Sequence, residues 1–512
     1  MVKWGKKSLI GFMVCSLFLL SFSGCGKKAI TTSEKASKGP VVLKFYFNGA
    51  ANTQKPENEK VHKYILDKTG YDVQVENIPD NNYDQKMKLT LASQDVFDGM
   101  GTIPLTYSWV DLKNKKLILP LNDLLDKYGQ NLKKEYGKNL SVTTDSDGKI
   151  WGLPRVMQET MFLPGIREDW LQKLNMKMPT SLKEFEIYLD AVSKTDLNGN
   201  GKHDEIPYCP WWTLWGFRLS MGPAFLGVNG VNYLTPDNKI MPIYMHPLYK
   251  SMLETLNKWY DKGWMYKEFA TQSDDKKTEL MKAGLIGSMN QWWFGGDATL
   301  KQGIKYSPMS PWTDAPGGIK GWGSNPSYDP NFAISSTSKH PEDVMKFANW
   351  VASDPANQLT LRYGIEGTDW KYTDSSKKSI EMIDGYTDRY LAFYNIFNFN
   401  FDDISLPIHP VDAISTDIAR VKNISKDWTG LPDTQHLWPF SFTGTAAENV
   451  GTDGDTMINE AILKTIYGQQ SINQWDATVK QYMSIQGTVV SQVQTEQWKK
   501  SFSNINPYAS IH

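Results

Sequence analysis

Two hydrophobic periods alternate along the first part of the chain. Residues 41–47 and 73–76 are strand-like, because apolar side chains dominate the first segment and alternate with polar ones in the second. Residues 57–68 and 83–93 instead space their apolar side chains as a helix does. Strands that alternate with helices predict an α/β fold whose sheet is mostly parallel.

Turn and cap signals extend this prediction beyond residue 140. Asp147-Gly148 is a turn dipeptide that leads into the strand-like residues 149–154. Ser181 and Glu184 have the spacing of a capping box, in which a hydroxyl and a carboxylate satisfy the free N–H groups of a helix start. We therefore expect an amphipathic helix directly after Ser181.

Two further helices and one irregular stretch follow. Apolar spacing predicts a helix over residues 248–261, and Pro341 suits the first position of another helix. Trp259 and Trp350 fall within these helical patterns and are expected to pack in the core. Gly and Pro are frequent over residues 308–330, which predicts a loop or a crossing between lobes.

The N-terminus has the order of an export signal. Lys3, Lys6 and Lys7 precede the apolar run 9–22, which is followed by Ser23, Gly24 and Cys25. The run is shorter than the roughly 20 residues that a membrane-spanning helix needs, so we predict a signal peptide over residues 1–24. Residues 25–39 are rich in Ser, Thr, Lys and Ala, and this composition predicts a flexible tether.

The segment 22–25, Phe-Ser-Gly-Cys, resembles the lipobox of bacterial lipoproteins, with Phe where that family usually has Leu. The resemblance implies that Cys25 carries lipid, palmitate included, and anchors the protein to the extracytoplasmic face of the cell membrane. Cys15 would leave with the signal, so Cys209 would be the one thiol left and no internal disulfide could form. We expect Cys209 to be a small buried hydrophobe.

Charge and aromatic content narrow the class of ligand. The formal net charge of −1 lacks the cationic excess with which nucleic-acid binders neutralise phosphates, so we expect no nucleic-acid partner. The chain also has 19 Trp and 24 Tyr, more amphipathic ring surface than a core requires. We infer that part of this surface lines a binding face.

Five segments in order resemble the bacterial extracellular solute-binding lipoproteins of the sugar-importer type, which include the alginate-oligosaccharide-binding proteins. The segments are Asp147-Gly-Lys-Ile-Trp-Gly-Leu-Pro154, Arg167 to Leu174 with Pro179 to Glu184, Asp196 to Pro207, His340-Pro-Glu-Asp343 and Tyr363 to Trp370. The resemblance spans nearly the whole chain after the tether.

This resemblance implies a two-lobed periplasmic-binding-protein-like α/β fold of type II, with hinge crossings and an interlobe cleft that holds the solute. Residues 40–154 with about 328–395 would form the N-terminal lobe, and residues 155–327 with about 396–512 the C-terminal lobe. The function implied is capture of an oligosaccharide and its delivery to the permease subunits of an ABC importer. We expect the protein to be a monomer.

A short loop carries oxygen-bearing side chains at alternate positions. These are Asp196, Asn198 and Asn200, followed by Asp204 and Glu205. Gly201 permits a sharp bend, and the Lys202 carbonyl could supply a further oxygen to a hard cation. Pro207 stands where an EF-hand has its bidentate Glu, so Asp204 and Glu205 would have to close the shell.

This compressed pattern resembles the calcium loop of the alginate-oligosaccharide-binding relatives, which implies a structural calcium ion. The alternative is an Asn-Gly-rich surface turn that binds nothing, since these residues favour turns in any case.

Sugars offer apolar C–H faces ringed by hydroxyl groups, so aromatic rings and planar polar side chains should converge on them. The aromatic candidates are Trp211, Trp212 and Trp215, then Trp292 and Trp293, Trp312, Trp322 and Tyr328, and finally Trp438. Each of them has the alternative of packing in the core. The pair Trp292-Trp293 is favoured, because a loop-like Phe-Gly-Gly follows it.

Two polar residues complete the candidate site. Asn48 follows the first predicted strand, at the end where open α/β sheets bind ligands. Arg155 follows the Gly-Leu-Pro turn near the presumed first crossing, and arginine suits planar bidentate contacts. The alternatives are a turn cap for Asn48 and a structural ion pair for Arg155.

Two other classes of function stay open. An exported polysaccharide-degrading enzyme would also need aromatic subsites, and such a hydrolase sets two carboxylates across the glycosidic bond. The acidic pairs at 274–275 and 402–403 read more simply as solvated turns, and no nucleophile elbow or zinc spacing occurs. The same fold could instead bind a peptide or report sugar to a sensor kinase, because fold does not fix ligand.

Overall fold

The structure is a computed structural model of the full chain. It describes residues 39–48, 56–101, 109–145, 147–156, 160–210, 214–291, 302–325, 328–383, 391, 393, 396–397, 408–409, 413–434, 438 and 440–503. Pro40–His512 form one compact unit, to which all the elements below belong. The predicted signal, Cys25 and the predicted tether up to residue 38 lie outside the described residues.

The first sheet has five strands in the order β2-β1-β3-β13-β4. The strands are β1 (Val41–Asn48), β2 (Tyr71–Ile78), β3 (Gly99–Met100), β4 (Leu153–Val156) and β13 (Tyr328–Ile334). β1 pairs in parallel with β2 and β3, whereas β13 runs antiparallel to β3 and β4. The strands predicted at 41–47 and 73–76 are confirmed as β1 and β2, whereas only Leu153 and Pro154 of the predicted strand 149–154 lie in β4. The prediction of a mostly parallel sheet is wrong for the sheet as a whole, because β13 returns from the other sheet and runs antiparallel to both of its neighbours.

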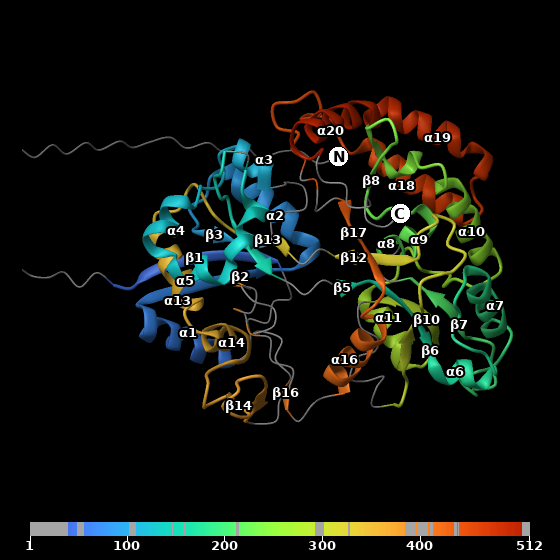
Figure 1. Cartoon of the computed structure of the whole chain (residues 1–512), viewed down its shortest axis with the longest axis horizontal. Helices are drawn as coiled ribbons and strands as arrows, with labels where there is room; N and C mark the ends of the chain where they lie inside the picture. The colour runs from blue at the N-terminus through green and yellow to red at the C-terminus, as the bar shows by residue number, and fades with distance from the viewer. Residues whose placement is uncertain are drawn as a thin grey trace, which may run out of the picture. The chain divides into compact units, whose positions relative to one another are not determined.

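Helices bury both faces of this sheet (Figure 1). The elements are α1 (Pro56–Thr69), α2 (Asp80–Ser93), α3 (Trp109–Asn114), α4 (Asn122–Tyr128), α5 (Gln130–Tyr136), α13 (Pro341–Val351) and α14 (Pro355–Tyr363). Phe45 of β1 packs on one face with Ile65 of α1 and Phe347 of α13, and Tyr46 packs on the other face with Met87 of α2. We call the residues of these two clusters, one on each face, the first core. Side chains alternate across a strand, so neighbours in β1 serve opposite faces.

The second sheet has four strands in the order β11-β6-β10-β7. They are β6 (Leu163–Arg167), β7 (Ile206–Cys209), β10 (Ile286–Gln291) and β11 (Tyr306–Pro308). A separate hydrophobic cluster, the second core, packs against it and includes Ile286, Tyr208, Phe185 and Trp259. Its helices include α6 (Glu168–Lys173), α7 (Leu182–Val192), α10 (Tyr249–Asp261), α18 (Asp453–Ile466) and α19 (Trp475–Tyr482).

Two chain segments run side by side between the sheets. β4 of the first sheet is followed by β5 (Thr160–Met161), and β12 (Gly321–Asn325) is followed by β13 of the first sheet. β12 pairs antiparallel with β5 and in parallel with β17 (Thr429–Pro432). The stretch 308–330 is thus not a loop throughout, because β12 and the start of β13 lie within it.

Smaller elements complete the described chain. They are α8 (Trp215–Leu219), α9 (Gly222–Leu226), β8 (Asn232–Leu234), β9 (Ile240–Pro242), α11 (Asp274–Lys282), β14 (Trp370–Tyr372), β15 (Ile380–Met382), β16 (Ile408–His409), α16 (Ala413–Ser425) and α20 (Thr488–Ser501), with 3₁₀ turns η1 (Gly137–Thr143), η2 (Ile243–Met245) and η3 (Ile472–Gln474). The turn η4 (Met483–Gly487) is π-helical and joins α19 to α20.

Most predicted helices begin and end within two residues of expectation, and Trp259 is fully buried as predicted. Trp350 is half-buried against the first core. Leu89 of α2 is 64% exposed, so it does not face the core as its two apolar neighbours Met87 and Leu91 do.

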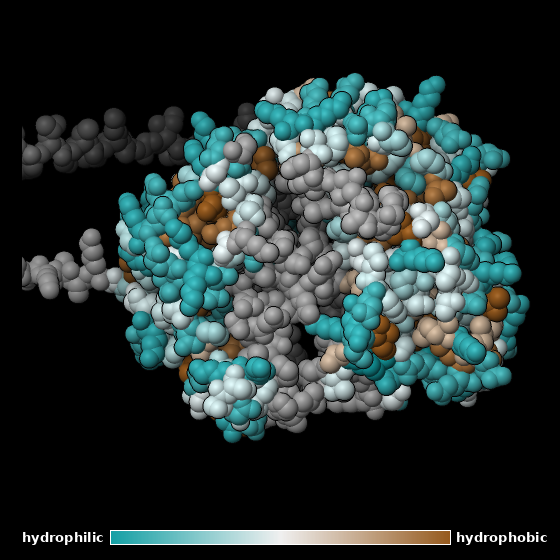
Figure 2. All heavy atoms as spheres, in the orientation of Figure 1, coloured by the Kyte–Doolittle hydropathy of each residue, from teal (hydrophilic) through white to brown (hydrophobic). Residues whose placement is uncertain are grey.

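The surface carries little continuous apolar area. In the view of Figure 2, hydrophilic residues cover most of the described surface, and apolar areas are small and scattered. Among the described residues, no helix combines the length and the apolar character needed to span a bilayer.

Candidate functional site

The register of the first sheet places three of the predicted residues at one edge. Asn48 is the last residue of β1, whose Tyr46 lies opposite Met100 of β3. Met100 in turn lies opposite Ala333 of β13, which runs antiparallel to β3. The carboxyl end of β1 and the first residues of β13, which begins at Tyr328, therefore lie at the same end of the sheet. Arg155 lies opposite Asp329 of β13. The backbone thus brings Asn48, Tyr328 and Arg155 to the same edge of the sheet.

Both Asn48 and Arg155 are half-buried, and each has interaction partners within the fold. Both residues thus lie at the edge of the sheet where open α/β sheets bind ligands. The side chain of Tyr328 is outside the described part of the structure.

The structure gives Trp322 and Trp438 packing positions rather than ligand-facing ones. Trp322 of β12 is fully buried, and its indole Nε1 donates to the carbonyl of Met309 at 2.9 Å. Its ring meets that of the equally buried Trp312 edge to face, with centroids 5.2 Å apart. Trp438 is 1% exposed and packs with Ile240 and Trp498. Burial of the ring faces by the protein leaves these positions no free surface for a sugar.

The other aromatic candidates lie outside the described residues. These are Trp211, Trp212, Trp292 and Trp293, together with the side chain of Trp215. Their flanking strands are described, however. β7 ends at Cys209 and β10 ends at Gln291, and the two strands pair in parallel with Met289 opposite Cys209.

The predicted calcium loop is a compact turn closed by its own side chains. Asp196 Oδ1 accepts from the backbone N–H of Gly199 at 2.7 Å, and Asp196 Oδ2 accepts from that of Gly201 at 2.8 Å. Gly199 and Gly201 have φ values of 78° and 76°, a region that favours glycine. The sequence therefore folds the loop so that its acidic and amide side chains point inward.

Asp204 and Glu205 close the loop from its far end. Asn198 and Asn200 donate through Nδ2 to Asp204 Oδ1, at 2.9 and 3.1 Å. These hydrogen bonds, that from Asn198 first, lower the pKa of the exposed Asp204 carboxyl. Glu205 Oε1 accepts from the backbone of Leu197 at 2.7 Å, and its buried Oε2 has no hydrogen-bond partner among the described residues.

The oxygen atoms of this loop are of the chemical types that bind a hard cation. Carboxylate and amide oxygens face one another within a few residues, and a buried carboxylate oxygen without a donor is suited to a cation. Within the described residues, on the other hand, no group of three or more His, Cys, Asp or Glu side chains is arranged to hold a metal ion. The side-chain amides of Asn198 and Asn200 and the carbonyl of Lys202 would therefore have to supply the remaining ligands of a bound cation.

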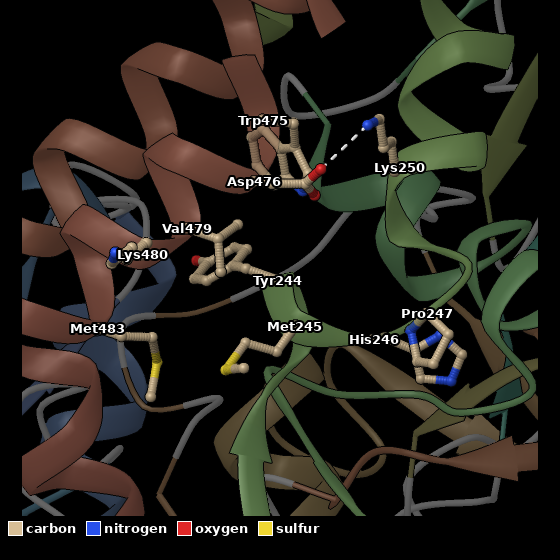
Figure 3. Close-up of a pocket in the computed structure, with 10 residues that line it drawn as sticks. All are labelled: Tyr244, Met245, His246, Pro247, Lys250, Trp475, Asp476, Val479, Lys480 and Met483. Carbon is tan, nitrogen blue, oxygen red and sulfur yellow. Dashed lines mark hydrogen bonds and ion pairs between the residues drawn. The ribbon is translucent and has the colours of Figure 1, made fainter. Parts of the chain in front are cut away.

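A separate pocket with a cavity volume of about 510 Å³ lies between the segment that follows β9 and the helix α19. Its lining consists of Tyr244, Met245, His246, Pro247, Lys250, Trp475, Asp476, Val479, Lys480 and Met483. Figure 3 shows Met245 and Met483 on two sides of the pocket and the ion pair of Lys250 with Asp476 at its rim, 3.2 Å between Nζ and Oδ2. The two segments lie far apart in sequence, so no local pattern could have predicted it.

Comparisons with known proteins agree on one family. The model of the family described as bacterial extracellular solute-binding protein matches residues 50–358. The polygalacturonan/rhamnogalacturonan-binding protein YtcQ of Bacillus subtilis is 23% identical over 517 residues, which cover 94% of this chain and 96% of YtcQ. The fructooligosaccharide ABC transporter substrate-binding protein FusA of Streptococcus pneumoniae is 32% identical over 182 residues, 32% of this chain and 33% of FusA.

Solved structures show the same fold. FusA in complex with kestose matches with a TM-score of 0.68 at 18% identity, covering 91% of this chain and 100% of that chain, and a FusA EF-hand mutant with fructo-nystose matches with a TM-score of 0.69 at 18% identity over the same shares. The alginate-binding protein AlgQ2, solved without calcium ion, matches with a TM-score of 0.66 at 18% identity, covering 90% of this chain and 99% of that chain. The two-lobed α/β fold expected from the sequence is thereby confirmed.

Proposed function

This chain belongs to the bacterial extracellular solute-binding protein family, and from this premise we propose that it captures an oligosaccharide for an ABC importer. The observation that carries the proposal is similarity over 94% of the chain to the polygalacturonan/rhamnogalacturonan-binding protein YtcQ, together with the fold shared with FusA in complex with kestose. Delivery to the permease subunits follows from this role. The protein would act as a monomer, because one cleft between two lobes suffices to enclose a solute.

We place the solute between two lobes with the boundaries expected from the sequence, residues 40–154 with about 328–395 and residues 155–327 with about 396–512. The separate first and second cores support two lobes. Ile396 and Phe397 pack in the first core and β16 pairs with β15, so the last crossing would follow β16 rather than residue 395. The paired crossings β4 to β5 and β12 to β13 would serve as hinge segments, since a few residues at element ends can absorb such a motion.

Residues at strand ends of both sheets would supply the contacts with the sugar. Trp211-Trp212 follows β7 closely and Trp292-Trp293 follows β10 directly, and these two strands are parallel neighbours. Asn48, Arg155 and Tyr328 belong to one edge of the first sheet. Stacking rings from one lobe and planar polar groups from the other are the combination that a sugar requires. Trp322 and Trp438 would take part only if a motion uncovered their rings.

Affinity for saccharides tests this proposal. We expect oligogalacturonides or kestose to raise the melting temperature of the purified protein in a thermal-shift screen. Trp293→Ala should then weaken binding of the positive saccharide by roughly ten-fold in calorimetry, because it removes one stacking surface. Trp428, a half-buried ring next to the second core, provides the matched control, and Trp428→Ala should leave the affinity unchanged.

Two results would contradict the assignment. Equal affinities of Trp293→Ala and the wild type would remove this residue from the site. If the protein bound peptides and no saccharide, the family assignment would still hold, but the proposed solute would be wrong. The family is one of binding proteins rather than enzymes, so release of shortened sugars in the same mixtures would count against the proposal as a whole.

We further propose that the loop from Asp196 to Glu205 binds a structural calcium ion. Asp196, Asn198, Asn200 and Asp204 would contribute side-chain oxygens, Lys202 its carbonyl and Glu205 its buried Oε2. The ion would neutralise the acidic side chains that meet there. The AlgQ2 and FusA structures, one solved without calcium ion and the other an EF-hand mutant, support a calcium loop in relatives.

Calorimetric scans with calcium or with a chelator test this site. Calcium should raise the melting temperature, since a ligand that binds only the folded state stabilises it, and Asp196→Ala should abolish the difference. Asp190, a partly exposed carboxylate on the preceding helix α7, provides the control variant Asp190→Ala. Identical scans for the wild type with and without chelator would refute the proposal.

Membership of the family implies that the protein is located outside the cytoplasm. We propose that lipid on Cys25 holds this chain at the outer face of the cell membrane. Cys25→Ser should release it from the membrane fraction into the medium or the periplasm, and retention of the variant in membranes would contradict this anchor.

A further inference from the structure

One buried carboxylate joins the two halves of the molecule. Asp111 lies in the short helix α3 and is 8% exposed. Its Oδ1 accepts from Ser441 Oγ at 2.7 Å, from Phe442 N at 3.1 Å, and from Thr443 N and Oγ1 at 3.4 and 3.1 Å. Hydrogen bonds to an ionised acceptor are about twice as strong as neutral ones, so this contact is costly to break.

The two sides of the contact are connected to different cores. Leu112, beside Asp111, packs in the first core with Met100 and Ala333 of the first sheet. Ser441 is tied to α20, where Gln497 Oε1 accepts from the Ser441 N–H at 2.9 Å and Gln497 Nε2 donates to the Ser441 carbonyl. Through η4, α20 continues the helix α19, whose side chains pack in the second core.

Two further contacts surround the carboxylate. Asn114 Nδ2 donates to Ser441 Oγ at 3.0 Å, and Lys115 Nζ lies 3.5 Å from Glu448 Oε1. Lys115 and Glu448 are each about one third exposed, so their ion pair contributes little to the stability of the contact and lies at its solvent-facing edge. We call Asp111, Asn114 and Lys115 with Ser441–Thr443 and Glu448 the latch.

In the chain, both sides of the latch follow strands whose carboxyl ends point toward the other lobe. α3 follows the carboxyl end of β3, and Ser441 follows the carboxyl end of β17. β17 runs parallel to β12, which leads into β13 of the first sheet, so the carboxyl end of β17 points toward that sheet. Open α/β sheets bind ligands at strand carboxyl ends, so lobes that close over a solute bring these two segments together.

We propose that Asp111 is a positioning residue that holds the two lobes closed and thereby sets solute affinity without touching the solute. This inference rests on the proposed function. Since binding requires the closed arrangement, the apparent dissociation constant rises as the closed population falls. Loss of a charge-assisted network shifts that population by about ten-fold or more.

Asp111→Ala, together with the milder Asp111→Asn, tests the latch on the full-length protein. With kestose or oligogalacturonide as the probe, Asp111→Ala should raise the dissociation constant by about ten-fold, because the closed population falls. Asp67→Ala removes an exposed carboxylate from α1 that is paired with Lys63, and it should leave the affinity unchanged. If Asp111→Ala does not fold, Thr443→Val removes a hydroxyl donor from the other side of the contact and should weaken binding in the same direction.

Two readouts need no ligand. Hydrogen exchange at the Phe442 and Thr443 amides should become faster in Asp111→Ala, and small-angle scattering should show a larger radius of gyration than for the wild type. Unchanged exchange, an unchanged radius, or an affinity that stays equal or rises would each overturn the latch. If the wild type binds no saccharide, the proposed function is wrong. Hydrogen exchange and the radius of gyration would still show whether Asp111 holds the two lobes together.

Discussion

At the scale of the residue, burial decides what an aromatic or ionisable side chain does. Trp170, Trp259, Trp312, Trp322, Trp370 and Trp438 are among the largest fully buried side chains. Much of the high Trp content therefore reflects core packing, which the sequence alone could not separate from a binding role. Cys209 is fully buried as predicted, and desolvation raises the pKa of its thiol to about 12.

His246 gives a residue-scale prediction for pH. Burial lowers the pKa of its ring to about 4 from 6.5, and its Nδ1 accepts from the Leu248 N–H at 3.2 Å, which requires that nitrogen to be unprotonated. The unfolded chain takes up a proton below about pH 6.5 and the folded chain does not. His246 therefore contributes stability above this pH, which is lost as the pH falls toward 4.

Urea unfolding at pH 7 and pH 5 measures this contribution. The wild type should lose more of its free energy of unfolding between the two pH values than His246→Gln, in which the titrating ring is absent. His340, 41% exposed at the start of α13, provides the control variant His340→Gln. Parallel pH dependence of the wild type and His246→Gln would show that the His246 ring is not held neutral.

At the scale of the element, local signals predicted helix starts and strand positions well. Ser181 is the N-cap of α7, and its Oγ accepts from the Glu184 N–H at 3.1 Å. Glu184 Oε2 reaches Thr180 rather than Ser181, at 2.8 Å from the backbone nitrogen. The capping pattern was thus readable from four adjacent residues, whereas the strand β12 was not, because Gly-rich strands lack the usual composition.

Ser181→Ala should lower the free energy of unfolding by about 1 kcal/mol, since it leaves the N–H of Glu184 without its acceptor. Ser181→Gly should cost only a few tenths of a kcal/mol, because glycine exposes that N–H to water. Denaturant titration of the two variants makes the comparison. Equal stability of Ser181→Ala and the wild type would mean that the cap contributes nothing to α7.

At the scale of the whole molecule, two cores are held together by a few specific contacts. The first core surrounds the sheet that contains β1, and the second core surrounds the sheet that contains β10. The described links include the crossings beside β5 and β13, the pairing of β15 with β16 ahead of α16, and the Asp111 network. Motion between lobes is expected for such an arrangement, because inter-domain contacts of this kind are limited and polar.

Matched core substitutions test the separation of the two cores. Ile65 in the first core and Ile286 in the second are both fully buried. Ile65→Val and Ile286→Val should each lower the free energy of unfolding by about 1 kcal/mol. The double variant should show the sum within roughly 0.5 kcal/mol, because distant sites without shared partners add. A clear departure from additivity in urea unfolding would reveal coupling between the cores.

The α/β class, most element positions and the family could be predicted from the amino-acid sequence, because hydrophobic period, caps and short motifs are local properties of the chain. It also located the Asp196 loop, whose interacting residues are neighbours. The three-dimensional fold was needed to show which rings are buried, that Arg155 and Asn48 share one sheet edge, and that Asp111 contacts Ser441. Those facts depend on strand order and on packing between distant segments, which no local pattern encodes.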